Sequence, residues 1–155
     1  MVDLLERLDV MLKQEVSEYG TMDYLAPEFQ QKLASIAQDD SLFQSSTASN
    51  SSSSTSSSST ISEVWREKIC EWSYQVIDHF EFSREVVSVA IHYLDRYLAT
   101  RTVNKKVFQL AAMTCLFLAI KLYEPGNLSM SSMIELSRGY FEVDQMVAME
   151  TSILR

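Results

Sequence analysis

The chain has very little glycine and proline. Among its 155 residues there are three glycines and two prolines, and neither type occurs between Glu28 and Glu124. Strands that are joined by tight turns need these two residue types, so their scarcity argues against a turn-rich β fold. Long stretches without either residue are instead typical of helices that are joined by short connections.

Cysteine is equally scarce. Cys70 and Cys115 are the only two cysteines, and both fall inside helical patterns. We therefore expect two small hydrophobic thiols in a reducing compartment and no disulfide framework. His79 and His92 have no partners at metal-binding spacing, and the chain contains no glycine-rich phosphate loop. These absences predict no cofactor, no metal site and no enzymatic activity.

A basic stripe and a long apolar run are also missing. The net charge is −8, with nine acids against three bases in residues 1–62 and twelve against ten in residues 63–155. This distribution argues against a nucleic-acid partner. Asp3 and Glu6 interrupt the N-terminal apolar residues, which argues against a signal peptide. The most apolar stretch, 110–120, is about half of the ~20 residues that cross a membrane, so no membrane partner is expected.

Composition divides the chain into three parts. Residues 45–60 contain fourteen Ser or Thr among sixteen residues, a composition that predicts disorder. We assign 1–40 to an N-terminal helical extension, 41–61 to a Ser/Thr-rich disordered linker and 62–155 to the main domain. Because a lone short helix is marginally stable, we expect the helical apolar stripe of the extension to pack on the main domain. Its members are Leu4, Leu5, Leu8, Met11, Leu12 and Val16.

The main domain carries five helical patterns. Apolar periodicity predicts helices over 62–79, from after Ser83 to 99, over 104–123, over about 131–138 and from about 143 onwards, with Ser62 and Ser83 as N-cap candidates. Ten of the eleven residues 110–120 are apolar, which places the third helix in the middle of the others. The predicted fold class is therefore all-α, a five-helix bundle around a central apolar helix. The chain ends inside the fifth helix, so we expect this helix to be incomplete.

A few charged side chains lie at the edges of these apolar faces. Asp95 needs either solvation or an internal partner, because burying a lone carboxylate is costly. Arg66 on the first helix is the candidate partner for a bidentate pair that fixes helix packing, with Arg96 turned outward. Lys121 and Glu150 could pair with each other or reach toward a partner protein, and their spacing does not choose between these alternatives.

The order of these residues resembles a cyclin box. The motifs in chain order are Arg66-x-x-Ile69-x-x-Trp72, Leu94-Asp95-Arg96-Tyr97-Leu98, Gln109-Leu110, Leu118-Ala119-Ile120-Lys121, Met149-Glu150 and Ile153-Leu154. The resemblance covers about residues 62–155. It extends more loosely to Asp23-Tyr24-Leu25, where cyclins often have a similar tyrosine. Residues 79–85 and 11–15 are similar to the cyclins of diatoms in particular.

The resemblance implies a regulatory subunit that binds and activates a cyclin-dependent protein kinase during cell-cycle progression, in the nucleus or the cytoplasm. Cyclins press on the mobile αC helix of the kinase and so restore the Lys–Glu ion pair that phosphoryl transfer requires. By this resemblance Lys121 and Glu150 match the kinase-contacting charges of the family. Arg66 and Asp95 match its buried ion pair.

The resemblance also implies a possible substrate-docking patch, whose matching residues are Trp65, Ile69, Trp72 and Gln109. This sequence departs from the family pattern at three positions. Trp65 and Lys68 stand where the well-known patch has smaller apolar residues, and Gln75 stands where it often has a carboxylate. These departures argue against recognition of the usual Arg-x-Leu docking motif and leave the kinase-binding residues unaffected.

Two other functions remain open at this point. A cyclin-fold adaptor related to transcription normally brings a basic face and two repeats, whereas residues 63–155 carry a charge of −2 (ten bases against twelve acids) and one repeat. A truncated cyclin with weakened kinase binding is the other alternative. In that case Glu150 would lie only about one turn from a free helix end.

Overall fold

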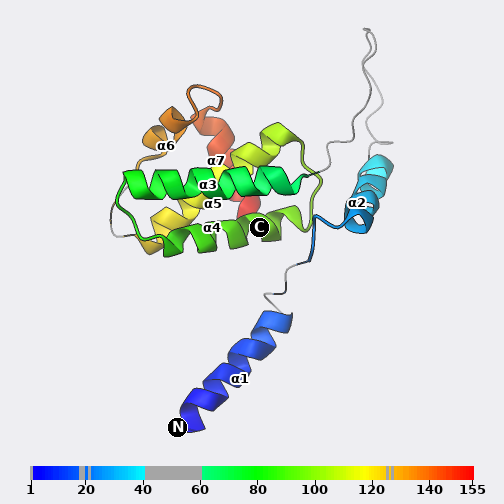
Figure 1. Cartoon of the computed structure of the whole chain (residues 1–155). Coiled ribbons are helices and arrows are strands. Elements are labelled where there is room, and N and C mark those ends of the chain that lie inside the picture. Colours follow the sequence, from blue (N-terminus) through cyan, green and yellow to red (C-terminus); the bar gives the residue numbers. More distant parts are fainter. Residues whose placement is uncertain (1, 18–19, 21, 41–60, 125, 127) are drawn as a thin grey trace.

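The computed structural model describes residues 2–17, 20, 22–40, 61–124, 126 and 128–155. Within these residues every regular element is a helix, which confirms the predicted all-α class. The helices are α1 (Val2–Ser17), α2 (Pro27–Asp40), α3 (Glu63–His79), α4 (Glu85–Leu98), α5 (Lys105–Tyr123), α6 (Met130–Leu136) and α7 (Val143–Ile153). The last five form a bundle, and their bounds agree with the predicted ranges within about two residues (Figure 1).

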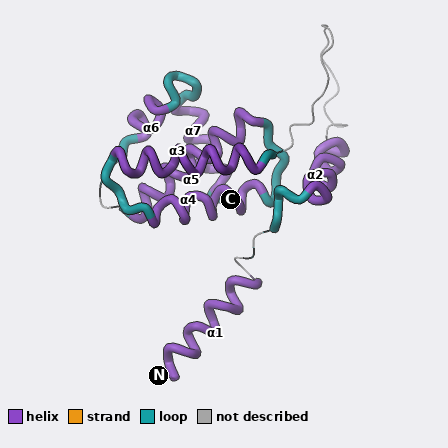
Figure 2. The backbone as a smooth tube through the Cα atoms, in the orientation of Figure 1, coloured by secondary structure: helices purple, strands orange, loops and turns teal. Residues whose placement is uncertain are grey.

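Helix α5 is the centre of this bundle, as its composition predicts. Every residue from Leu110 to Ile120 is buried, and α5 contacts α3, α4, α6 and α7 (Figure 2). The one polar residue of this stretch, Thr114, donates its hydroxyl to the Leu110 carbonyl at 2.8 Å, so no buried polar group is left unsatisfied there. By length and composition α5 could cross a membrane. The same properties are those of a helix that other helices surround.

Side chains cap most of the helix starts. Ser62 Oγ accepts from the Val64 amide at 3.2 Å, as predicted, and Asn104 Oδ1 accepts from the Val107 amide at 2.9 Å. At α7 the side chains of Glu142 and Gln145 form a reciprocal capping box.

The predicted Ser83 cap is wrong, because no side chain caps the start of α4. The Ser83 amide instead donates to Glu124 Oε1 at 2.8 Å. The next residue, Arg84, forms a bidentate pair with Asp78 at 2.9 and 2.7 Å. The α3–α4 turn is therefore held by these contacts, and the side chain of Ser83 is not needed to start the helix.

The N-terminal apolar stripe does not pack on the bundle, so that prediction is wrong. Helix α1 stands apart in Figure 1, and the leucines and methionine of its stripe (Leu4, Leu5, Leu8, Met11, Leu12) are 53–71% exposed. The contacts between the N-terminal part and the bundle come from residues further along the chain. Tyr24 is buried in the core, and Leu25 and Phe29 pack against it.

Helix α2 has no counterpart among the helices predicted from periodicity. Its start is typical of a helix, because Pro27 occupies the first helical position and Glu28 places an acid in the first turn. Gln30 Nε2 donates to the Ile61 carbonyl at 2.9 Å, and Ile61 is buried in the core. Ile61, which directly precedes the predicted main domain of 62–155, therefore packs with the bundle. The predicted disorder of the Ser/Thr tract concerns residues 41–60, which lie outside the described residues.

Both cysteines are free thiols, as predicted. Cys115 is fully buried in α5, whereas Cys70 is half-buried on α3. Burial raises the pKa of the Cys115 thiol well above its ordinary value. The thiol is therefore neutral at physiological pH and acts as a small apolar side chain.

Candidate partner-binding site

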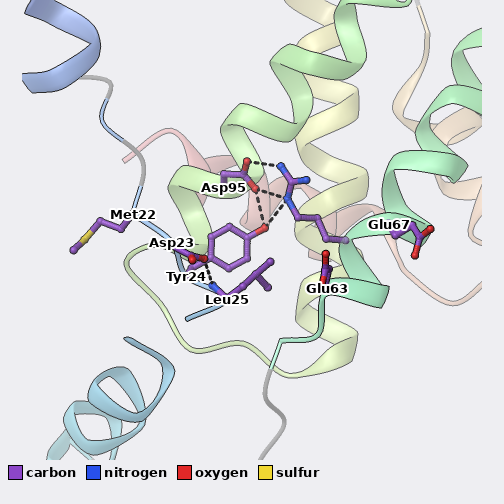
Figure 3. A pocket seen from close by; sticks show the side chains of 8 residues that line it. Met22, Asp23, Tyr24, Leu25, Glu63, Glu67 and Asp95 are labelled. Carbon is purple, nitrogen blue, oxygen red and sulfur yellow. Dashed lines mark hydrogen bonds and ion pairs between the residues drawn. The ribbon is translucent and has the colours of Figure 1, made fainter. Parts of the chain in front are cut away.

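Three polar side chains meet where the N-terminal part joins the bundle. Arg66 on α3 forms a bidentate pair with Asp95 on α4, with Nη2–Oδ2 at 2.8 Å and Nε–Oδ1 at 3.2 Å. The Tyr24 hydroxyl donates to Asp95 Oδ1 at 2.8 Å and accepts from Arg66 Nε at 3.0 Å. Figure 3 shows the Tyr24 hydroxyl directed at the Asp95 carboxylate. Both residues line a cleft with a volume of about 710 Å³. We call these residues the Tyr24–Arg66–Asp95 cluster.

The electrostatics of the cluster keep Tyr24 and Arg66 in their ordinary protonation states. Burial, followed by the hydrogen bond to Asp95, raises the pKa of the Tyr24 phenol, so the phenol remains a neutral donor. The hydrogen bond to Asp95 raises the pKa of the Arg66 guanidinium further above its usual range. The side chains of Arg66 and Asp95 are 34% and 17% exposed, so the predicted pair is present but only partly buried. Arg96 is exposed, as expected.

Lys121 and Glu150 form an ion pair on another face of the bundle. Lys121 ends the buried stretch of α5, and its Nζ lies 3.0 Å from Oε1 of Glu150 on α7. Glu150 is only 15% exposed, whereas the Lys121 side chain is 57% exposed. The two residues that follow Lys121, Leu122 and Tyr123, are also largely exposed. The structure thus joins the two charges whose relationship their spacing left open, and it places an exposed cation beside exposed apolar side chains.

The four predicted patch residues line one groove, with a volume of about 1230 Å³. Trp65, Ile69 and Trp72 come from α3, and Gln109 comes from the first half of α5. The Trp65 ring packs on Phe108 at a centroid distance of 5.7 Å. The groove therefore has an aromatic floor between two helices, which suits an apolar side chain of a partner.

Sequence reasoning missed several residues of these sites. Tyr24 was noted only as similar to a tyrosine of the family, because nothing in the sequence brings it to Asp95. The far wall of the groove, which includes Tyr140 and Phe141, was not predicted. Lys105 and Lys106 also line the groove. The sequence could have indicated them, because two cations at the start of an apolar helix are unusual. Within the described residues no three His, Cys, Asp or Glu side chains gather in a way that could hold a metal ion.

The chain is similar in sequence to known cyclins. The family model for the cyclin N-terminal domain matches residues 38–155. The chain is 32% identical over 94 residues to the G2/mitotic-specific cyclin-2 of Antirrhinum majus, covering 61% of this chain and 21% of that protein. It is 26% identical over 90 residues to Cyclin-A1-4 of Oryza sativa (58% and 25% covered) and 29% identical over 89 residues to the G1/S-specific cyclin-D1 of Xenopus laevis (57% and 31% covered).

The fold defines an all-helical domain built around one buried helix. The chain belongs to the cyclin family, since the family model covers more than half of its length. It spans about a fifth to a third of the length of the three relatives named above. The finer likeness to diatom cyclins stays a prediction.

Proposed function

We propose that this chain is a regulatory, non-catalytic subunit that binds a cyclin-dependent protein kinase and activates it in the control of the cell cycle. The observation that carries the proposal is the Lys121–Glu150 pair, with Nζ and Oε1 3.0 Å apart. It holds two charges that match the kinase-contacting charges of cyclins on one exposed surface. The nucleus or the cytoplasm is the proposed location, since kinases of this class act there.

The physical character of this surface supports the proposal. Exposed aliphatic and aromatic side chains beside one well-placed charge are typical of the centre of a protein interface. Leu122, Tyr123 and Val147 are exposed on the two helices that carry Lys121 and Glu150. Because Glu150 orients the Lys121 ammonium, little side-chain entropy is lost when a partner accepts a hydrogen bond from it.

The proposed activation works through the kinase and requires no reactive group in this chain. A cyclin that packs on the αC helix of its kinase stabilises the active arrangement of that helix. The energy for this shift comes from a binding surface that fits the active arrangement better than the inactive one. The bundle supplies such a rigid surface, because residues 110–120 of α5 are buried and α5 packs against both α4 and α7.

Co-purification with a panel of cyclin-dependent kinases tests the proposal. The wild-type chain is expected to bind at least one of them and to raise its activity on a peptide substrate. The double variant Lys121→Ala, Glu150→Ala should lose most of this binding while its circular dichroism spectrum stays unchanged. The matched control removes the exposed ion pair of α1, Asp9→Ala with Lys13→Ala, and should bind normally. Undiminished kinase binding by the Lys121, Glu150 variant would refute the assigned interface.

A further inference from the structure

The groove beside α3 carries a charge opposite to that of the whole chain. Its lining contains three lysines and no aspartate or glutamate, although the chain has a net charge of −8. The lysines are Lys68, Lys105 and Lys106. The cleft at the Tyr24–Arg66–Asp95 cluster is lined by four acids and one arginine. Two neighbouring faces of α3 therefore present opposite charges, and the positive one coincides with the aromatic floor of the groove.

The positions of Lys105 and Lys106 are unfavourable for the helix itself. Both lie in the first turn of α5, which contains no acid. The N-terminus of a helix carries a partial positive charge, so cations there cost stability and anions contribute to it. Helix stability therefore gives no reason for two lysines at this place. Binding of an anionic group across the first turn would explain the two lysines, because residues that conflict with local helix stability are expected at functional sites.

The lysines also lie close to the aromatic rings of the groove. Lys105 Nζ is 6.0 Å from the centroid of the Trp65 ring, and Lys106 Nζ is 5.5 Å from the centroid of the Tyr140 ring. None of the ion pairs found among the described residues includes Lys68, Lys105 or Lys106. The groove thus combines an apolar floor with three exposed ammonium groups that have no carboxylate partner within the described part of the chain.

We propose that this groove binds a peptide segment of a partner protein in which apolar residues are flanked by aspartate or glutamate. The apolar residues would pack on Trp65, Ile69 and Trp72, and the flanking carboxylates would meet the lysines. Charge complementarity selects an acidic partner over a basic one. This inference rests on the proposed function, since it takes the groove as a docking surface of a regulatory subunit and names the chemistry of the docked segment.

The chain provides its own reporter for the experiment. Trp65 and Trp72 are its only two tryptophans, and both line the groove, so intrinsic tryptophan fluorescence reports occupancy directly. The probe is a synthetic peptide without tryptophan, with a central Leu-Phe pair and two aspartates on each side. A matched peptide replaces the aspartates by lysines, and another replaces Leu-Phe by Ala-Ala. We expect the acidic peptide to bind about tenfold more tightly than the lysine peptide, because several exposed charge pairs add up. Both replacements should weaken binding.

Charge reversal in the groove gives the second arm of the test. The variant Lys68→Glu, Lys106→Glu should bind the acidic peptide about tenfold more weakly and prefer the lysine peptide. The control Lys13→Glu, Lys32→Glu makes the same change in net charge on exposed residues of α1 and α2, and its affinity should change less than twofold. The neutral variant Lys68→Gln, Lys106→Gln supplies an intermediate value and keeps the test valid if the reversed variant does not fold.

Other results would overturn the inference. Equal affinity for the acidic and lysine peptides, or unchanged affinity after charge reversal in the groove, refutes it. Sedimentation of the free chain identifies a different occupant if charge reversal dissociates a dimer, since the groove would then hold a second copy. The peptide titration needs no kinase, and the groove variants should still bind the kinase that wild type binds. Failure of the peptide test is therefore distinct from failure of the proposed function.

Discussion

Tyr24 and Asp95 are joined by a hydrogen bond of 2.8 Å although 71 residues separate them in the chain. Because Asp95 also pairs with Arg66, one carboxylate connects α4, α3 and the segment that precedes α2. The Tyr24 side chain is buried against the core. Tyr24 therefore attaches the N-terminal part to the bundle in two ways, through the hydrogen bond of its hydroxyl and through the packing of its ring. Removal of the hydroxyl alone should separate these two contributions to stability.

Replacing Tyr24 by phenylalanine keeps the ring and removes the hydroxyl. Because hydrogen bonds to charged groups are worth roughly 1.5–3 kcal/mol, we expect the free energy of unfolding to fall by about 1.5 kcal/mol. Urea denaturation measures this change, and hydrogen exchange should show weaker protection of the α2 amides. The control Tyr74→Phe alters an exposed tyrosine and should stay within about 0.5 kcal/mol of wild type. Equal effects of the two substitutions would contradict the attachment role.

A double-mutant cycle measures the coupling between Arg66 and Asp95. Exposed ion pairs are worth about 0–1 kcal/mol, whereas breaking a buried pair costs about 3–5 kcal/mol. The Arg66 side chain is 34% exposed, which places this pair between the two limits. We expect a coupling energy of about 1–2 kcal/mol from urea denaturation of Arg66→Ala, Asp95→Ala and the double variant. A coupling near zero would mean that the pair is effectively solvated and does not fix how α3 packs on α4.

The predicted helices were those whose signals are local. Apolar periodicity and cap residues lie within a few positions of each helix, so α3 to α7 could be located within about two residues. Helix α2 also has local signals, a proline start and apolar residues at helical spacing (Phe29, Leu33, Ile36 and Ala37), yet it was not predicted as a separate helix. The prediction of a Ser83 cap was wrong because cap propensity considers only the residues next to the helix start. In the structure the Ser83 amide binds Glu124 and Arg84 binds Asp78, and both partners lie outside that range.

Contacts across the bundle could be predicted only where both partners are charged residues at the edges of apolar helix faces. Arg66 and Asp95 are charges at the edges of apolar faces on consecutive helices, so their pairing could be inferred. Lys121 and Glu150 are also charges at the edges of apolar faces, and they too are 29 residues apart. Their helices are not consecutive, however, because α6 lies between α5 and α7, so only the packing of α7 on α5 joins them. Tyr24 is uncharged and lies outside the predicted helices, so its sequence context does not mark it. Its role depends on where the chain returns in space, and the sequence does not encode that locally.

The Lys121–Glu150 pair should matter far more for kinase binding than for stability. Its lysine is 57% exposed, and exposed ion pairs are worth about 0–1 kcal/mol, so Lys121→Ala should lower the free energy of unfolding by less than about 1 kcal/mol. Thermal or urea denaturation checks this value beside Arg84→Ala, which removes one partner of an exposed pair elsewhere. A loss of several kcal/mol for Lys121→Ala would show that reduced kinase binding reflects a damaged bundle and not a lost contact.

The Cys115 thiol should make the protein less stable in alkaline solution. Burial raises its pKa above the ordinary value of 9.0, so the folded chain holds this proton more tightly than the unfolded chain does. The contribution of the protonated Cys115 thiol to the free energy of unfolding is fully present below pH 9. It is lost as the pH rises above 9, because the thiol ionises first in the unfolded state. One such group lowers the free energy of unfolding by up to about 1.4 kcal/mol per pH unit.

Urea denaturation from pH 7 to pH 10.5 under reducing conditions measures this slope. Cys115→Ala should flatten the decline above pH 9, because it removes the thiol that must ionise, while it lowers stability at pH 7 by about 1 kcal/mol through lost packing. Cys70→Ala is the matched control, since Cys70 is only half-buried and its pKa is also raised by burial. Its slope should therefore lie closer to that of wild type. A residual decline belongs to Cys70, Tyr24 and Tyr93, because burial raises the pKa of each of these groups and the effect on stability has the same sign. Identical slopes for wild type and Cys115→Ala would show that the Cys115 thiol does not control the alkaline transition.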